Sequence, residues 1–284
     1  MKAWLQLVRA PAALTVLGDT VAGAAAAGKP LRGKRLALPL SSVALYWSGM
    51  ALNDWADREL DAVERPERPI PSGRISPEQA LAAAGALSLS GLCLAAFAGG
   101  RDALRVAVPL TAAIWAYDVK LKSTPAGPAA MALCRALDVT LGAGAGRWKS
   151  ALTPAAVLAG HTFGVTAVSR GEVHGGSPAS ARLALAGTVS SAVVTGSGRM
   201  RASSHRLAAT VFALGYGGFV GSAQLAASRD PSAASVRKAT VAGIHGMVPL
   251  QAGLAARRGS VLGAVLVACA LPLARRLSRR NSPT

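Results

Sequence analysis

Charged and aromatic residues are scarce in this chain of 284 residues, and their scarcity excludes several classes of protein. Only 15% of the residues are charged and 4% are aromatic, whereas 51% are hydrophobic and the mean hydropathy is +0.37. This composition is too apolar for an ordinary soluble protein of this length. The sequence therefore predicts a membrane protein.

Acidic residues are the scarcest charged type, with 13 Asp and Glu against 31 Lys and Arg, which gives a net charge of +18. Such an excess invites a nucleic-acid partner. However, the basic residues lie at the ends of nearly every apolar segment and form no stripe with interleaved aromatics. Charge in these positions is typical of membrane topology, so we expect no nucleic-acid partner.

Cysteine is also rare. Cys93, Cys134 and Cys269 all lie inside apolar segments, and their spacing fits neither a disulfide framework nor a metal site. We expect each to behave as a small buried hydrophobic residue.

Long apolar segments account for most of what is present. Several are shorter than the ~20 residues that a membrane-crossing helix needs, so one of the last four is a candidate for a re-entrant or buried piece. We predict an all-α bundle of nine or ten transmembrane helices and, because no linker divides the chain, a single domain over residues 1–284. The expected spans are 12–28, 36–54, 78–99, 103–118, 128–146, 153–169, 181–196, 207–227, 239–256 and 260–274.

An acidic segment, residues 53–61, follows the second of these spans and is the most informative part of the chain. On a helix at about 100° per residue, Asn53, Asp57 and Asp61 share one face and Asp54 lies beside them. Carboxylates at this spacing repel one another unless a cation neutralises them. Mg²⁺ prefers oxygen ligands and commonly joins one or two carboxylates to substrate phosphates, so the segment predicts a diphosphate site.

A basic, proline-rich loop comes next, at residues 65–76. Its prolines end the helix and stiffen the loop, and Ser76 before Pro77 is typical of a helix N-cap. A stiff basic loop beside an acidic helix suits an anion held through a metal. The alternative is a solvated loop whose arginines pair with Asp side chains or lipid head groups.

These two segments resemble the UbiA superfamily of intramembrane prenyltransferases. Its first signature is Asn-Asp-x-x-Asp-x-x-x-Asp followed by Arg-Pro-x-x-Ser-Gly, which residues 53–61 and 68–73 match. The resemblance implies a helical bundle with a central cavity, Mg²⁺-dependent use of an isoprenoid diphosphate, and prenyl transfer to an acceptor that is often aromatic. It makes Asn53, Asp54, Asp57 and Asp61 the metal ligands and Arg68 a substrate-binding residue.

A third element, residues 117–124, resembles one found after the fourth span in the same superfamily. It supplies Tyr117, Lys120 and Lys122 as substrate-binding candidates, because lysines at a cavity mouth can neutralise a departing diphosphate. The alternative is that these lysines only flank a span and extend toward its polar surface.

The second acidic motif of the superfamily, commonly Asp-x-x-x-Asp, is incomplete here. In the corresponding residues 169–177, Glu172 is the only carboxylate. We assign Glu172 as a metal ligand and catalytic residue together with Asp54, Asp57 and Asp61, and leave open whether a second Mg²⁺ binds. His174 is either a further ligand, a base or an exposed loop residue.

Polar residues inside the spans admit two interpretations. Arg135 and Asp138 lie three residues apart and can pair on one helix face, or Arg135 can project into the cavity and contact diphosphate. We expect Asp19, His161, Gln224 and His245 to make interhelical polar contacts.

The predicted function is Mg²⁺-dependent transfer of a prenyl group from an isoprenoid diphosphate to a small aromatic or lipid-like acceptor within the membrane. The incomplete second motif motivates an alternative, a non-catalytic lipid-binding or assembly factor that retains the diphosphate pocket. A transporter is disfavoured because the acidic motif is not repeated. Membrane lipids are expected partners, and no oligomeric state follows from the sequence.

We expect an integral protein of the cell membrane. The loops 55–77, 119–127 and 170–180 should share its cytoplasmic face, because parts of one diphosphate site cannot lie across a bilayer.

Overall fold

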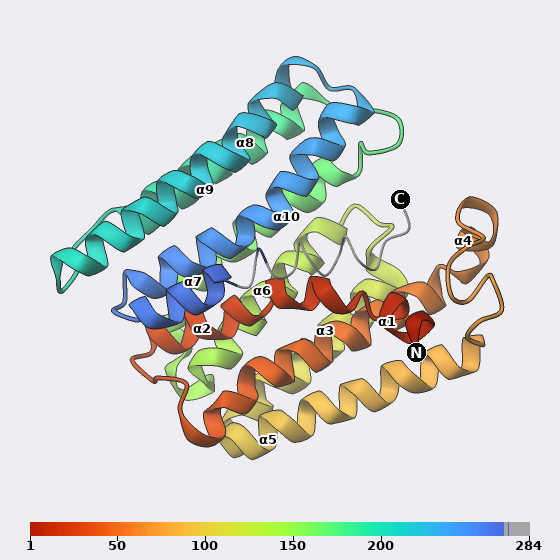
Figure 1. The fold of residues 1–284 in the computed structure, drawn as a ribbon, viewed down its shortest axis with the longest axis horizontal. Coiled ribbons are helices and arrows are strands. Elements are labelled where there is room, and N and C mark those ends of the chain that lie inside the picture. The colour runs from red at the N-terminus through yellow and green to blue at the C-terminus, as the bar shows by residue number, and fades with distance from the viewer. Residues whose placement is uncertain (270–271, 273–284) are drawn as a thin grey trace.

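A computed structural model describes residues 1–269 and 272, and this part of the chain folds as a bundle of helices without strands (Figure 1). The long helices are α2 (Leu17–Ala26), α3 (Ala37–Ala56), α5 (Pro77–Ala116), α6 (Gly127–Ala143), α7 (Trp148–Ser169), α8 (Pro178–Gly196), α9 (Ser203–Arg229) and α10 (Ala233–Ala256). The short ones are α1 (Lys2–Leu7), η1 (Ala10–Thr15), η2 (Gly33–Leu36), α4 (Arg58–Glu64), η3 (Tyr117–Leu121) and η4 (Ala145–Arg147). Residues 261–269 are also helical.

Helix α5 consists of two antiparallel segments joined at Gly100. Gly100 has φ 59° and ψ −143°, a conformation that favours glycine. The Trp115 indole N–H donates to the Ser88 hydroxyl at 2.9 Å, although 27 residues in a straight helix would span about 40 Å. The chain therefore reverses at Gly100, and the separate predicted spans 78–99 and 103–118 are confirmed as two helical segments.

Small residues allow the helices to approach closely, as expected where lipid gives little hydrophobic drive between helices. Gly142 in α6 lies against the backbone of Thr20 in α2, and a Cβ at Gly142 would be only 2.1 Å from the Thr20 carbonyl oxygen. Cys134 is buried, as predicted, but Cys93 and Cys269 are exposed on the protein surface.

Two helical segments, Pro77–Leu121 and Ala145–Ser169, are long and apolar enough to cross a membrane by length and composition. The outward faces of other helices also carry large apolar side chains, such as Leu183 in α8 and Leu214 in α9. The remaining predicted spans coincide with helices, although the last one, 260–274, lies partly outside the described residues.

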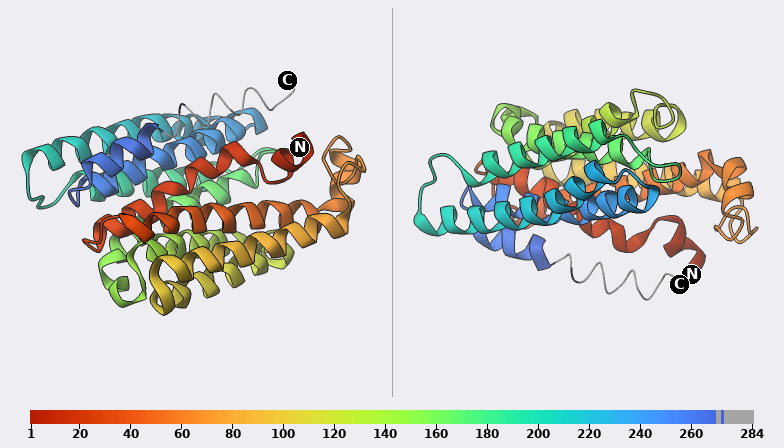
Figure 2. Two further views of the ribbon diagram at one scale, coloured as in Figure 1. Left: turned by 60° about the horizontal axis from the view of Figure 1, so that its bottom comes forward. Right: turned by 90° about the horizontal axis from the view of Figure 1, so that it is seen from above.

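The bundle has two ends, which we call the site end and the far end (Figure 2). The site end contains α1, α4 and the loops 65–76, 122–126 and 170–177. The far end contains the turns 27–36, 99–102, 144–147, 197–202 and 257–260. Contacts between turns fix this division, because Lys122 contacts Asn53 at one end and Arg257 contacts Ser197 at the other.

Candidate functional site

The acidic segment joins two helices rather than lying on one. Helix α3 ends at Ala56, Asp57 has φ −89° and ψ 5°, and α4 begins at Arg58. The expected uninterrupted helix over 53–61 is therefore wrong at Asp57. The one-per-turn spacing nevertheless survives, because the Asp57 N–H donates to the Asn53 carbonyl at 2.9 Å and the Asp61 N–H donates to the Asp57 carbonyl at 2.8 Å.

Arg68 joins two of the carboxylates. Its Nη1 donates to Asp61 Oδ2 at 2.6 Å and to Asp54 Oδ1 at 3.3 Å. Both carboxylates are buried, so an unpaired charge on either would be costly. Arg9 Nη2 also donates to Asp54 Oδ1 at 3.2 Å, and Arg65 Nη1 lies 3.9 Å from Asp61 Oδ1.

The proline-rich loop is held firmly by its own hydrogen bonds and by two isoleucines. Ile70 and Ile75 are buried against Leu52. The Ser72 hydroxyl donates to the Arg68 carbonyl at 2.6 Å, and Ser76 forms the predicted N-cap with a reciprocal bond to Gln79. This anchoring fixes the backbone that presents Arg68.

Lys122 joins the third carboxylate to the asparagine. Its Nζ lies 2.7 Å from Asp57 Oδ1 and donates to Asn53 Oδ1 at 3.1 Å. The helix before it, η3, is a π-helix in which the Lys122 N–H bonds the Tyr117 carbonyl five residues back. This wide turn directs Lys122 toward the acidic segment, whereas Lys120 is exposed. Of the two predicted lysines, only Lys122 reaches the site in this structure.

Two basic residues at this end, Arg9 and Arg170, make contacts that no sequence motif predicted. Arg9 has a left-handed backbone, with φ 45°, and reaches Asp54 from the segment before η1. Arg170 donates to the Thr124 carbonyl and so ties the loop 170–177 to the loop 122–126. The three predicted loops thus converge on one end of the bundle.

Glu172 lies at this end but apart from the acidic segment. Its carbonyl accepts from Arg237 at 2.8 Å, and its half-buried carboxylate makes no hydrogen bond or ion pair within the described residues. His174 is exposed, as one of its three interpretations expected.

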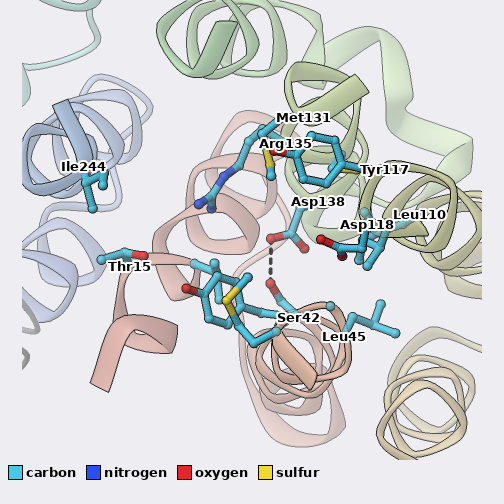
Figure 3. Close-up of a pocket in the computed structure, with 16 residues that line it drawn as sticks. Thr15, Ser42, Leu45, Leu110, Tyr117, Asp118, Met131, Arg135, Asp138 and Ile244 are labelled. Atoms are coloured by element: carbon cyan, nitrogen blue, oxygen red, sulfur yellow. Dashed lines mark hydrogen bonds between the residues drawn. The ribbon is translucent and has the colours of Figure 1, made fainter. Parts of the chain in front are cut away.

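A cavity of about 240 Å³ lies along the same elements that carry the acidic segment and Lys122 (Figure 3). Gly49 and Met50 line it from the turn of α3 before Asn53, and Tyr117 and Asp118 line it from η3. Its other walls are mainly apolar, with side chains such as Leu45, Leu110, Ile114, Met131 and Ile244.

Two buried carboxylates face this cavity. The Ser42 hydroxyl donates to Asp138 Oδ2 at 2.5 Å, but the other oxygen of Asp138 has no partner. One oxygen of Asp118 is likewise without a hydrogen-bond partner. Figure 3 shows both side chains turned toward the same space. Buried polar atoms are rarely left unpaired, so a molecule in this cavity with hydroxyl or amine donors would satisfy them.

Arg135 lines the cavity but pairs with Asp19 rather than with Asp138. Its Nη1 lies 2.6 Å from Asp19 Oδ2, and Gln251 donates to the other oxygen of Asp19 at 2.7 Å. The sequence allowed either an Arg135–Asp138 pair on one helix face or an Arg135 side chain that projects into the cavity. Within the described residues the pair is absent, and Arg135 lines the cavity. Asp19 makes the interhelical contact that was expected of it.

His161 also makes an interhelical contact. Its ring nitrogens lie 3.0 Å from the Gly243 carbonyl and 2.8 Å from the Tyr216 hydroxyl.

The carboxylate and amide oxygens at the site end are the type of ligand that Mg²⁺ prefers. Within the described residues, no three Asp, Glu, His or Cys side chains converge as a complete metal site. Mg²⁺ needs only one or two carboxylates when a substrate phosphate supplies further oxygens. The two carboxylate oxygens that share Arg68 Nη1 provide such a pair, so Asp54 and Asp61 fit this mode of binding, whereas Asn53 and Asp57 share Lys122.

Comparisons with known proteins identify the family of the chain and its fold. Digeranylgeranylglyceryl phosphate synthase from Methanopyrus kandleri is 36% identical over 126 residues, which are 44% of this chain and 46% of that protein. The chain thus spans less than half the length of the curated relatives it matches.

Two solved structures share the fold at low identity. A UbiA homologue from Aeropyrum pernix K1 has a TM-score of 0.65 and 16% identity, covering 85% of this chain and 96% of that one. A homologue from Archaeoglobus fulgidus bound to DMAPP and Mg²⁺ has a TM-score of 0.58 and 15% identity, covering 87% of this chain and 98% of that one. The profile of the UbiA prenyltransferase family matches residues 14–240, so the chain belongs to this family of integral membrane proteins.

Proposed function

We propose that the chain is a Mg²⁺-dependent prenyltransferase that moves a prenyl group from an isoprenoid diphosphate to a small lipid-like acceptor within the membrane. The observation that carries this proposal is the meeting of the acidic segment, Arg68 and Lys122 at one end of the bundle, beside an apolar cavity. The names of the relatives support it, because one is a digeranylgeranylglyceryl phosphate synthase and another binds DMAPP with Mg²⁺.

The site residues divide into oxygen donors and cations. Asn53, Asp54, Asp57 and Asp61 would hold Mg²⁺, which would supply positive charge beside the diphosphate leaving group. Arg68 and Lys122, which now pair with these carboxylates, are placed to exchange part of that pairing for diphosphate oxygens. Positive side chains fixed at the leaving group stabilise charge that develops there.

The cavity receives the prenyl chain and the acceptor. Its apolar walls exclude water, which otherwise would capture the allylic centre and turn transfer into hydrolysis. Tyr117 lies at the junction between the cavity and the Lys122 turn, and Arg135 lines the wall beside Asp138.

The acceptor carries a hydroxyl group in this proposal. The unpaired oxygens of Asp118 and Asp138 favour a hydrogen-bond donor over an aromatic carboxylate, which they would repel. A lipid alcohol therefore suits the cavity better than a benzoate.

Reconstitution tests the proposal directly. Vesicles containing the protein, Mg²⁺, a lipid extract and labelled geranyl, farnesyl or geranylgeranyl diphosphate should release diphosphate and form a prenylated lipid. EDTA should stop both, and an Asp61→Asn variant provides the matched protein control. Binding of a prenyl diphosphate without release from any donor and extract would instead support the second candidate, a non-catalytic lipid-binding or assembly factor. The isolated Glu172 carboxylate is the observation that favours this candidate.

The topology that we propose has nine or ten spans in one domain, with the site end in the cytoplasm. The convergence of the three loops supports a shared face, since Lys122 contacts Asp57 and Arg170 contacts Thr124. We place this face toward the cytoplasm of the cell membrane, where soluble isoprenoid diphosphates would reach it.

A further inference from the structure

The far end of the bundle carries a groove that the proposed reaction does not use. Its cavity is about 550 Å³, within the usual range for ligand pockets, and it lies between α2, the turn 27–36 and the helical residues 261–269. A second cavity of about 300 Å³ adjoins it and shares Ala25, Gly28 and Arg258 with it. We call the two together the far-end groove.

One side of the far-end groove is apolar. Leu17 and Val21 form its floor on the face of α2, and Leu36, Leu262 and Leu266 form its walls. The three wall leucines are 57%, 74% and 64% exposed, so they present apolar surface outward rather than filling the protein core. In an integral membrane protein, such a surface faces the hydrocarbon chains of lipids.

The other side of the far-end groove is basic. Side chains from three separate turns gather there, and His205 lies among them. The basic lining residues are Lys29, Arg32, Arg199, Arg201, Arg257 and Arg258.

These cations are not balanced by carboxylates. None of the ion pairs within the described residues involves a far-end side chain. Asp102 is the only acidic residue in the far-end turns, and its Oδ1 accepts the Gly146 N–H at 2.7 Å. Asp102 and Lys29 Nζ both lie beside Gly144, and Asp102 also acts electrostatically on Arg35, so this one carboxylate offsets part of the charge and the far end keeps an excess of positive charge.

Helix capping accounts for one of these cations but not for the rest. Arg257 donates to the Val194 carbonyl at 2.6 Å and to the Ser197 carbonyl at 3.2 Å, so it caps the last turn of α8. The side chains of Lys29, Arg32 and Arg258 make no hydrogen bond or ion pair within the described part of the chain. Lys29 lies near Asp102, but Arg32 and Arg258 have no structural partner that explains their position at the groove.

We propose that the far-end groove binds an anionic phospholipid, with its phosphate at the basic side and a hydrocarbon chain along the leucines. Both sides of the groove are needed for this ligand. A free anion would contact only the basic side chains, and a lipid without net charge would not be attracted by the excess of positive charge. The proposal is independent of the prenyl-transfer reaction, since the turn 27–36, which lines the groove, lies at the end opposite α4 (Figure 1).

Native mass spectrometry of the delipidated full chain tests this binding. We titrate the protein with phosphatidylglycerol and with phosphatidylcholine of the same acyl chains. Phosphatidylglycerol should bind more tightly, and Lys29→Gln with Arg258→Gln should weaken it by about 25-fold, at about fivefold for each charge near a lipid phosphate. Equal binding of the two lipids to the unmodified protein overturns the proposal.

A matched control removes the same charges elsewhere on the far end. Lys34 and Arg101 are exposed and line neither cavity. Lys34→Gln with Arg101→Gln should leave phosphatidylglycerol affinity within about twofold. A loss equal to that of the groove variant means that diffuse charge attracts the lipid, and the specific site is then wrong.

Two further measurements distinguish a bound phospholipid from a bound free anion. Leu266→Ser should weaken phosphatidylglycerol, and millimolar inorganic phosphate should fail to displace it. Displacement by phosphate alone overturns the choice of a lipid. If the double variant fails to fold, Arg32→Gln replaces it, because Arg32 is exposed and should still give about a fivefold loss. An unchanged affinity in that folded variant counts against the proposal equally.

Discussion

The two ends of the bundle treat charge in opposite ways. At the site end, Asp54, Asp57 and Asp61 each pair with a basic side chain: Arg68 joins Asp54 to Asp61, and Lys122 joins Asp57 to Asn53. At the far end, basic side chains line a groove whose lining contains no carboxylate. The difference teaches that net charge alone says little about function here, because pairing decides which cations are available to a ligand.

The largest expected effect comes from removing a charge within the paired network. Asp57→Asn and Asp61→Asn should each lower prenyl transfer by about 100- to 1,000-fold, as loss of a group that stabilises transition-state charge commonly does. Mg²⁺-dependent binding of a prenyl diphosphate should fall as well. Circular dichroism checks that the bundle is still folded, and unchanged diphosphate affinity in either folded variant rules out the metal assignment.

The second effect separates the two lysines that follow the fourth predicted span. Lys122→Ala should lower turnover by about 10- to 100-fold, because it removes a charge-assisted contact at the leaving group. Lys120→Ala is the matched control and should retain nearly full activity, since Lys120 is exposed. Steady-state rates at saturating Mg²⁺ measure both, and equal losses contradict the role given to the η3 turn.

A smaller effect is expected at the isolated carboxylate. Glu172→Gln should lower turnover by about 3- to 10-fold, whereas His174→Gln should change it little, because charge near the diphosphate is what the reaction depends on. Rates measured at several Mg²⁺ concentrations test this order. If His174→Gln is the more damaging change, the assignment of Glu172 is wrong.

Gly176→Asp restores the four-residue spacing after Glu172 and should maintain or raise activity. A Cβ at Gly176 would lie 3.1 Å from a Val236 methyl, so the Val236 side chain must shift slightly. Diphosphate binding without release in both the wild type and this variant would favour the lipid-binding alternative.

The smallest effect on activity comes from single cysteines that map the two ends. Ser72, Ser123 and Ser177 are exposed at the site end, and Ser204 is exposed at the far end. In a background without the native cysteines, the first three should react with an impermeant thiol reagent from one side of the membrane and Ser204→Cys from the other. Labelling of any site-end pair from opposite sides breaks the proposed site.

Much of the fold was readable from the sequence because lipid-facing helices need long apolar runs. The turn at Gly100 divides α5 where the sequence predicts a break between spans, and Ser76 caps its helix as its position before Pro77 indicates. The break at Asp57 could not be read, since helical spacing persists across it and only the backbone angles differ.

Parts of the site depend on contacts between residues far apart in the chain. Arg9 reaches Asp54 across 45 residues, and Arg135 reaches Asp19 across 116 residues. Intrahelical spacing instead pointed Arg135 toward Asp138. Which partner an arginine selects depends on how neighbouring helices rotate against each other, and a periodic pattern does not carry that information.

The π-helix at Tyr117–Leu121 links two properties of the protein that would otherwise vary independently. Asp118 lines the cavity and Lys122 contacts Asp57, and both directions depend on one wide turn. Deleting one residue from this turn would rotate everything after it by about 100°. Such a change would alter the shape of the apolar cavity and the contact between Lys122 and Asp57 together.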